Sequence, residues 1–357
     1  MTAPFPLIDI SGAPFERGVQ YGRQAKERIA RSVALYGGRL QRLGLSPARI
    51  ADLVQVYLPH MQAFGEHYVA EMEGIAKGAG LLLSDIVLVN ARTEIVALAR
   101  KSEQPKDGCT GVIILPSHAA TGRLIHAQNW DWLAACADTG IVLRIRRDDG
   151  PDILTFTEAG GLARSGLNGA GLAITANYLE SNRDYQQQGV PLPLIRRKVL
   201  EQSHLALAIE AIVRTPKACS NNMMLSDAKG FAVDFECAPD EVFPIHAENG
   251  RLVHANHWQS AVALTKLKDT GLADVPDSLY RDRRVMELLG QNPSVKNVKQ
   301  ALFDDFGTPY AVCRPPITES DGNLGATVAM IVMEPGARVM EVCPMPALDR
   351  TFTRYSL

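Results

Sequence analysis

The chain changes its pattern at Asp107-Gly108-Cys109-Thr110-Gly111. Before this point, residues 12 to about 100 carry apolar side chains at helical spacing. After it, short runs rich in β-branched residues follow one another between turn signals. Helices and strands that come in blocks indicate an α+β fold rather than alternating βαβ units. We therefore expect a large antiparallel sheet with helices on its outside.

The residue pattern predicts the individual elements by number. Helices are expected over 16–43, 46–77 and 86–99 in the first part, and over 192–213, 278–289 and 295–306 in the second. Strands are expected over 110–115, 124–130, 141–146, 153–157, 171–177, 222–226, 231–236, 242–246, 251–255, 326–333 and 338–342. The last two strands are joined by Glu334-Pro335-Gly336-Ala337, which is typical of a hairpin.

Composition and charge limit the classes of function. A length of 357 residues allows one large domain or two modest ones with an ample core. The net charge of −2 provides no concentrated basic surface, so no nucleic-acid partner is expected. No run of apolar residues is long enough for a membrane span, and the first ten residues lack the pattern of a secretory signal. These features predict a cytoplasmic protein.

The six cysteines show neither a Cys-x-x-Cys pair nor a zinc-type spacing, so most are expected to be small buried side chains. His246, His254 and His257 leave a zinc hydrolase as an alternative. However, His-x-x-His at the end of a strand should point to opposite faces, and no Cys or carboxylate completes a familiar ligand set. We therefore expect no metal and no cofactor.

Cys109 stands out because Gly108 precedes it and a strand follows it. A thiolate could attack the Gly108 carbonyl, take the chain onto sulfur and release it to water, which would leave Cys109 with a free α-amino group. That amine has a pKa of roughly 7.7–8.0, close to the roughly 8.5 of a thiol, so it can act as the base for its own side chain. An N-terminal nucleophile of this kind needs no catalytic histidine.

Two further segments supply partners for such a nucleophile. Gln128-Asn129-Trp130-Asp131-Trp132 lies one hairpin later and can return beside Cys109, where Asp131 could hold the cationic amine. Asn256, at the end of another predicted strand, can donate its amide to a developing oxyanion. Ordinary structural roles remain as alternatives: Asp131 as a turn cap, Asn256 as a turn residue, and Trp130 and Trp132 as packing residues.

These segments resemble the fungal acyl-coenzyme A:6-aminopenicillanate acyltransferase family of N-terminal-nucleophile hydrolases. The resemblance extends along nearly the whole chain. It is carried by Pro14-Phe15-Glu16-Arg17-Gly18, Gly74-Ile75-Ala76-Lys77-Gly78, Asn90-Ala91-Arg92-Thr93-Glu94, Gly108-Cys109-Thr110, Gln128-Asn129-Trp130-Asp131, Thr157-Glu158-Ala159-Gly160, Val253-His254-Ala255-Asn256-His257 and Gly325-Ala326-Thr327.

The resemblance implies a four-layer αββα sandwich, matured from one precursor into residues 1–108 and residues 109–357, which together form one domain. It implies that Cys109 is the nucleophile for self-cleavage after Gly108 and for turnover. Asp131 would be the active-site aspartate and Asn256 the oxyanion donor. Thr110, Asn129 and Arg314 would contact substrate.

Two positions depart from the family pattern. Leu324 stands where the penicillin enzyme has an arginine before Gly-Ala-Thr, and Arg314 is the candidate to replace that charge. Gly111 stands where the family usually has threonine. These departures concern the substrate more than the mechanism.

The function expected from these residues is that of a self-processing amidohydrolase or acyltransferase. Cys109 would take an acyl group from an amide or acyl-CoA substrate, held in an apolar acyl pocket, and pass it to water or a small amine. The partners are then a small-molecule substrate and the chain's own cleaved subunits, with homo-oligomerisation left open. The alternative is a catalytically silent small-molecule binding protein on the same fold.

Overall fold

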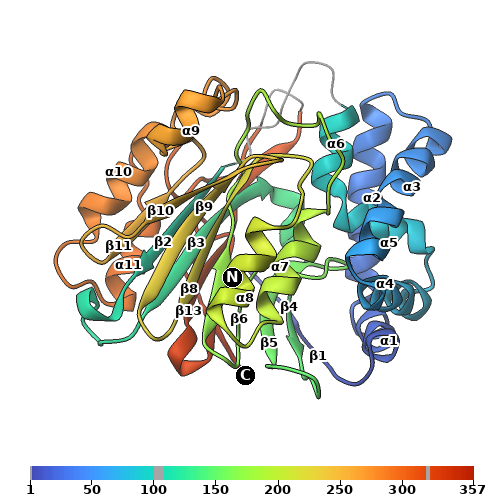
Figure 1. Cartoon of the computed structure of the whole chain (residues 1–357), viewed down its shortest axis with the longest axis horizontal. Helices are drawn as coiled ribbons and strands as arrows, with labels where there is room; N and C mark the ends of the chain where they lie inside the picture. The colour runs from blue at the N-terminus through green and yellow to red at the C-terminus, as the bar shows by residue number, and fades with distance from the viewer. Residues whose placement is uncertain (1, 100–107, 319–321) are drawn as a thin grey trace.

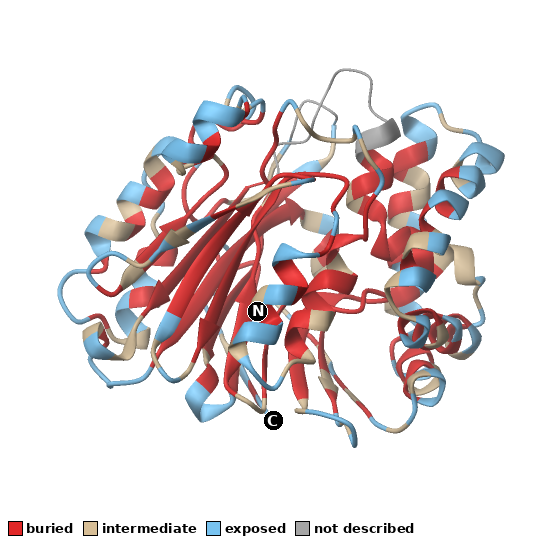
Figure 2. Cartoon of the chain, viewed as in Figure 1, coloured by how far each residue is buried: buried red, intermediate tan, exposed pale blue. Residues whose placement is uncertain are grey.

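The computed structural model describes residues 2–99, 108–318 and 322–357, so Asp107 lies outside the described residues. Two sheets lie against each other, and helices flank them on both outer sides (Figure 1). Most residues of the strands are buried, whereas the exposed residues gather on the outer sides of the helices (Figure 2). This layering confirms the predicted αββα sandwich.

The first sheet has eight strands in the order β1-β4-β5-β6-β7-β8-β9-β10. Neighbouring strands are antiparallel except for β1 and β4, which are parallel. The sequence pattern did not predict β1. This strand joins the N-terminal segment to the first sheet by pairing with β4. The bounds are β1 (Leu7–Ile10), β4 (Gly140–Ile145), β5 (Ile153–Glu158), β6 (Ser165–Asn168), β7 (Leu172–Thr175), β8 (Asn221–Asp227), β9 (Phe231–Cys237) and β10 (Val242–His246).

The second sheet has the order β11-β2-β3-β13-β14-β15, and β12 pairs with β13 outside this path. Its bounds are β11 (Arg251–His254), β2 (Cys109–Ile114), β3 (Ile125–Leu133), β13 (Leu324–Glu334), β14 (Val339–Pro344), β15 (Thr353–Ser356) and β12 (Ile317–Thr318). Cys109 lies opposite Trp130 in the antiparallel β2–β3 pair, which confirms that the 128–132 segment returns beside the cysteine. The predicted hairpin of β13 and β14 is also confirmed.

Helices α1–α8 belong to the side of the first sheet, where α7 and α8 pack on β6–β8, and α10 and α11 cover the second sheet (Figure 1). Their bounds are α1 (Pro14–Gln24), α2 (Lys26–Arg42), α3 (Pro47–Phe64), α4 (Glu66–Ala79), α5 (Leu83–Asn90), α6 (Arg92–Ala99), α7 (Leu192–Leu200), α8 (Leu205–Val213), α9 (Ala261–Lys266), α10 (Ser278–Leu288) and α11 (Val295–Leu302). No helix in the described part of the chain is both long and apolar enough to cross a bilayer.

Four of the expected helices are each divided in two. The 86–99 stretch breaks at Ala91. The 16–43 stretch breaks at Ala25, and the 46–77 stretch breaks at Gly65, a residue type of low helix propensity. The 192–213 stretch breaks before His204, whose Nδ1 accepts a hydrogen bond of 3.1 Å from the backbone N–H of Ala206 and so begins α8. Apolar periodicity alone does not reveal such interruptions, because the buried face continues across them.

Helices α1 and α4 touch through glycines. A Cβ atom added at Gly74 would lie 2.2 Å from the carbonyl oxygen of Phe15 and 2.9 Å from the Cα of Gly18. One turn further along, a Cβ at Gly22 would lie 2.3 Å from the carbonyl oxygen of Ile75. The two backbones therefore approach so closely that no larger residue fits between them.

We predict that Gly74→Ala lowers the free energy of unfolding by about 1–3 kcal/mol or more, because the added methyl group overpacks this contact. The matched control is Gly37→Ala inside α2, where an added Cβ meets nothing within 4 Å. The control should be neutral or stabilising by up to ~1 kcal/mol through helix propensity. Urea unfolding of both variants measures the difference, and equal stabilities would contradict the close approach.

Candidate active site

The backbone of Gly108 and Cys109 lies at the start of β2 and is held by three hydrogen bonds. The Gly108 carbonyl oxygen accepts a hydrogen bond of 2.8 Å from the backbone N–H of Asp131. The Cys109 N–H donates to Oδ1 of Asn256 at 2.7 Å, and the Cys109 carbonyl oxygen accepts from Nη1 of Arg281 at 2.7 Å. The structure therefore brings Cys109, Asp131 and Asn256 together, as the sequence predicted.

Arg281 of α10 joins these groups into one network. Its Nη1 also donates to Oγ1 of Thr110 at 2.9 Å, and its Nη2 donates to Oδ1 of Asn256 at 2.8 Å. Its Nε donates at 2.7 Å to Asp277, which supplies the opposite charge. Because Arg281 is fully buried and hydrogen-bonded along its whole guanidinium group, it fixes the backbone around Cys109 in one geometry.

Asp131 presents a carboxylate beside Gly108. Its Oδ1 accepts a hydrogen bond of 2.6 Å from Thr327, and its Oδ2 lies 3.4 Å from Nε of Arg314 in an ion pair. Oδ2 has no hydrogen-bond donor among the residues that the structure describes. Burial raises the pKa of this carboxyl group, while the charges of Arg314 and Arg281 oppose that rise. Asp131 thus keeps one oxygen available at the peptide bond.

The lack of a side chain at Gly108 is a steric requirement of this arrangement. A Cβ atom there would lie 2.7 Å from Oδ2 of Asp131 and 2.7 Å from both Cζ and Nη2 of Arg314. Any other residue would push the carboxylate and the guanidinium group away from the peptide. The sequence feature Gly-Cys, weak by itself, therefore has a physical cause in the two charged side chains.

The sulfur of Cys109 lies on the other face of β2, toward the first sheet. Its Sγ is 3.8 Å from Nη2 of Arg164, whose guanidinium carbon lies 4.3 Å from the centre of the Trp130 ring. Trp130 is fully buried and packs edge-on against Phe156 of β5, which agrees with the packing role expected for it. A cation beside a cysteine sulfur stabilises the thiolate form.

The residues predicted to contact substrate occupy different surroundings. Asn129 donates from Nδ2 to the carbonyl oxygens of Leu302 and Val312 at 2.7 and 2.8 Å, so this amide nitrogen holds the segment after α11. Thr110 accepts from Arg281, as described above. Their contacts with substrate stay predictions.

Arg314 is buried and forms ion pairs with Asp131 and Asp277 at the Gly108 side of the site. Leu324, where the penicillin enzyme would carry an arginine, is half exposed at the start of β13. The second departure, Gly111, also has a local cause, because a Cβ there would lie 2.3 Å from Sδ of Met224.

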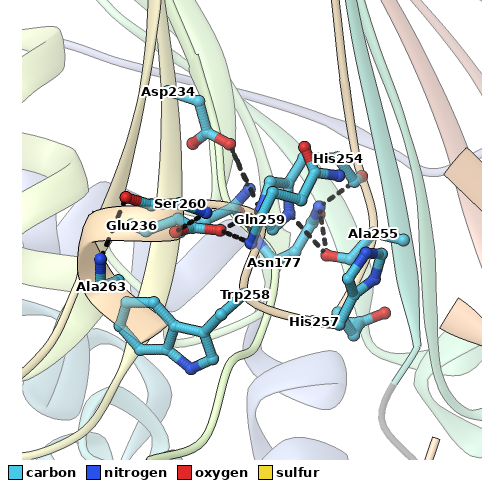
Figure 3. A network of polar contacts seen from close by, with 12 residues as sticks. Asn177, Asp234, Glu236, His254, Ala255, His257, Trp258, Gln259, Ser260 and Ala263 are labelled. Carbon is cyan, nitrogen blue, oxygen red and sulfur yellow. Dashed lines mark hydrogen bonds and ion pairs between the residues drawn. The ribbon is translucent and has the colours of Figure 1, made fainter. Parts of the chain in front are cut away.

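A network of buried charges supports the turn that carries Asn256 (Figure 3). His254, the last residue of β11, lies 2.8 Å from Oε1 of Glu236 and 3.8 Å from Oδ2 of Asp234 through its Nε2. Glu236 also accepts a hydrogen bond of 2.5 Å from the backbone N–H of Gln259. The carboxylates of β9 therefore hold both ends of the turn, and with it the position of Asn256.

Asn177 ties this turn to β3. Its Nδ2 donates to the carbonyl oxygens of His254 and Ala255 at 2.9 and 3.0 Å, and its Oδ1 accepts from Gln128 at 2.7 Å. The sequence analysis missed Asn177, Arg164, Arg281 and Asp277, and it gave no role to Thr327 of the Gly325-Ala326-Thr327 segment. The first four are ordinary polar residues in unremarkable segments, and only the fold brings them to Cys109.

The expectation that His254 and His257 point to opposite faces was wrong. Their rings stack with centres 6.3 Å apart and planes 22° apart, because β11 ends at His254 and the chain turns there. In the described residues, no group of three His, Cys, Asp or Glu side chains has the geometry to hold a metal ion. The nitrogens of His254 are instead directed at Glu236 and at the carbonyl oxygen of Ala255.

Comparisons with known proteins show similarity over most of the chain. Residues 119–345 match the family described as acyl-coenzyme A:6-aminopenicillanic acid acyl-transferase. The chain is 30% identical over 315 residues to the acyl-coenzyme A:6-aminopenicillanic-acid-acyltransferase 40 kDa form of Emericella nidulans, covering 86% of this chain and 84% of that protein.

Solved structures extend the similarity of fold. A mutant of the conjugated bile acid hydrolase from Clostridium perfringens superposes with a TM-score of 0.50 at 12% identity, covering 70% of this chain and 92% of that one. Penicillin V acylase from Agrobacterium tumefaciens gives a TM-score of 0.46 at 15% identity, with 70% and 86% covered. At 12% identity the first similarity concerns the fold alone.

We predict that the free energy of unfolding falls as the pH rises from about 6.5 to about 9. Burial by itself would lower the pKa of His254, but Asp234 and Glu236 outweigh it and raise the pKa to about 9. The folded state therefore holds the proton more tightly than the unfolded chain does. The stabilisation is complete below pH 6.5 and is lost through pH 9, a change on the order of 3 kcal/mol.

Chemical denaturation at pH 6, 7.5 and 9 measures this change in the wild type, in His254→Gln and in the exposed control His246→Gln. His254→Gln should be less stable at pH 6 and should lose this part of the pH dependence. His246→Gln should follow the wild type. If the free energy of unfolding of the wild type stays constant or rises over this pH range, the raised pKa of His254 in the folded state is contradicted.

Proposed function

We propose that this chain, which belongs to the acyl-coenzyme A:6-aminopenicillanic acid acyl-transferase family, is a self-processing enzyme that forms an acyl-enzyme on Cys109. The observation that carries the proposal is the set of hydrogen bonds that Asp131, Asn256 and Arg281 make to the backbone of Gly108 and Cys109. The bond from Asp131 continues the β2–β3 pairing, whereas Asn256 and Arg281 add side-chain partners that an ordinary strand cysteine does not need. This geometry supports cleavage at the Gly108–Cys109 peptide bond.

In the proposed self-cleavage, the thiolate of Cys109 attacks the carbonyl carbon of Gly108. A C–S bond forms, the C–N bond breaks, and the nitrogen takes a proton and becomes the α-amino group of Cys109. The backbone N–H of Asp131, 2.8 Å from the Gly108 oxygen, can stabilise the oxyanion. Water then hydrolyses the thioester, which releases the Gly108 carboxylate and returns the thiol.

After cleavage, the new amine would lie between two acceptors already in place. Oδ1 of Asn256 accepts from this nitrogen in the uncut chain, and Oδ2 of Asp131 has a vacant acceptor position beside Gly108. The amine can then take the proton from the Cys109 thiol. The predicted role of Asn256 as an oxyanion donor depends on the two N–H groups of its Nδ2. One of them donates a hydrogen bond of 2.9 Å to the carbonyl oxygen of Tyr178.

The proposed substrates are amides or acyl-CoA thioesters, with water or a small amine as the acyl acceptor. The name of the Emericella nidulans relative supports an acyl-CoA donor and an amine acceptor for that protein. Arg314 lies beside Gly108, where it can supply the positive charge that Leu324 lacks. The two products of cleavage, residues 1–108 and 109–357, would stay together because β1 pairs with β4.

We predict that purified wild-type protein is cut between Gly108 and Cys109 and that Cys109→Ala stays whole, because alanine has no sulfur to take the chain. Mass spectrometry of the intact protein measures both outcomes. Cys237→Ala, which removes a buried thiol from β9, is the matched control and should be cut like the wild type. An uncut wild type that turns over substrate would contradict the mechanism.

The same samples separate the enzyme from a silent binding protein. In the enzyme, Cys109 should be alkylated faster than Cys219 or Cys237, and Cys109→Ser should lose or strongly slow turnover. In a binding protein, the three thiols should react alike, and Cys109→Ser should bind ligand as the wild type does.

We predict that Gly108→Ala slows self-cleavage roughly 100-fold, since a displacement of about 1 Å in a reacting group can cost this much. The added methyl group would collide with Asp131 and Arg314 at 2.7 Å. Gly169→Ala is the control, because the nearest neighbour of its Cβ would lie 3.6 Å away, at an ordinary contact distance. The uncut fraction is followed over time after synthesis. Cleavage of Gly108→Ala at the wild-type rate would show that the two charged side chains play no part.

A further inference from the structure

A narrow hollow next to Cys109 is lined by three arginines, of which only Arg164 has been given a role so far, as the cation beside the sulfur. Arg92 begins α6, Arg164 precedes β6 and Arg196 lies in α7, so three distant segments meet here. We call this hollow the arginine pocket. Through Nη2 of Arg164 it reaches to 3.8 Å from the Cys109 sulfur. A cationic side chain therefore lies beside the sulfur.

Arg92 is the one member of the arginine pocket with a paired carboxylate. Its Nη2 lies 2.7 Å from Oε2 of Glu158. Glu158 is further occupied by the hydroxyl group of Tyr36 and by the thiol of Cys136 at 3.5 Å. Glu158 therefore neutralises Arg92 and has no second charge to give to the other two arginines.

Arg164 and Arg196 lack such a carboxylate. Within the described part of the chain, Arg196 makes no hydrogen bond or ion pair, and the Nε atoms of both arginines are buried without a partner. Burial lowers the pKa of Arg196 to about 9, and the charges of Arg164 and Arg92 act in the same direction. Burial also raises the pKa of the nearby Glu94 carboxyl, which weakens it as a counter-charge.

Arg164 and Arg196 are less than one-tenth exposed and have no paired carboxylate among the described residues, and such buried charges are costly to keep in a folded protein. An anion that enters the arginine pocket would recover that cost, since charge-assisted hydrogen bonds to guanidinium groups are strong and planar. Resting on the function proposed above, we propose that the substrate carries a carboxylate a few bonds from the carbonyl that Cys109 attacks, and that Arg164 and Arg196 bind this carboxylate.

Two alkylating reagents of nearly equal size test the arginine pocket without any substrate. Iodoacetate carries a carboxylate and iodoacetamide a neutral amide, and an ordinary thiolate repels the anionic reagent. We expect Cys109 of the folded wild type to react with iodoacetate roughly 10-fold faster than with iodoacetamide. The rates are read by mass spectrometry of the peptide that contains Cys109, with the other cysteines as internal references.

Variants of Arg196 locate the preference. At Cys109, Arg196→Gln should lower the ratio of the iodoacetate rate to the iodoacetamide rate until it equals the ratio at the other cysteines. Arg196→Lys should keep part of the preference for iodoacetate. Arg214→Gln, at an exposed position after α8, should keep the wild-type ratio. Faster reaction of wild-type Cys109 with iodoacetamide than with iodoacetate would overturn the inference. This comparison uses the wild-type protein alone, so it does not depend on the folding of any variant.

Three anilides distinguish the two positions that the carboxylate can take. Valeryl p-nitroanilide is neutral, glutaryl p-nitroanilide has a carboxylate at the end of an acyl chain of equal length, and the valeryl amide of 5-amino-2-nitrobenzoate has it on the leaving amine. We expect one of the two carboxylated substrates to exceed the neutral one roughly 10- to 100-fold in kcat/KM, as for a charged hydrogen-bonded pair.

Failure of the inference and failure of the proposed function look different. A higher kcat/KM for the neutral anilide would overturn the arginine pocket as a carboxylate site. The proposed function as an enzyme would still stand. No acylation of Cys109 by any of the three anilides, together with a preference for iodoacetate, would overturn the function and leave the anion site standing.

Discussion

The structure around Cys109 depends on the peptide bond between Gly108 and Cys109 being held in one geometry, which the proposed self-cleavage would use. The carbonyl oxygen of Gly108 and the nitrogen of Cys109 each have one defined partner, Asp131 N–H and Asn256 Oδ1. Holding a reacting group in place before reaction removes entropy from the barrier, which is a large source of rate in intramolecular chemistry. The glycine is part of the same constraint, because only a residue without Cβ lets the charges of Asp131 and Arg314 stand beside that bond.

The rest of the molecule can be understood as support for this geometry. Arg281 is inserted from α10 and spans Cys109, Thr110 and Asn256 with one rigid guanidinium group. His254 between the carboxylates of β9 fixes the turn after β11 from the opposite side. Buried charges of this kind add little stability in themselves, yet removing one partner is expensive. They are therefore better suited to fixing one arrangement of Asn256 than to strengthening the fold.

The residue pattern predicted the α+β class and the β2–β3 pairing, because strand periodicity and short hairpins leave few alternatives. The four layers and the grouping of Cys109, Asp131 and Asn256 were implied by the family resemblance. The residue pattern did not predict β1, which has only four residues, or the breaks at Gly65 and before His204, where the apolar face continues. It also missed Arg164, Arg196 and Arg281. An arginine in a helix or a loop resembles a solvated surface residue until the fold shows that it is buried, and nothing local distinguishes the two cases.

The central claim is that the reactive sulfur and a free α-amino group belong to the same residue. A 1,2-aminothiol condenses with 2-cyanobenzothiazole to a stable ring, whereas an internal cysteine cannot form this ring because its nitrogen is part of a peptide. Active protein treated with this reagent should carry one label, on Cys109 at the start of the 109–357 piece, and should lose turnover in proportion to labelling. Fully active protein that takes up no such label at Cys109 would contradict the account.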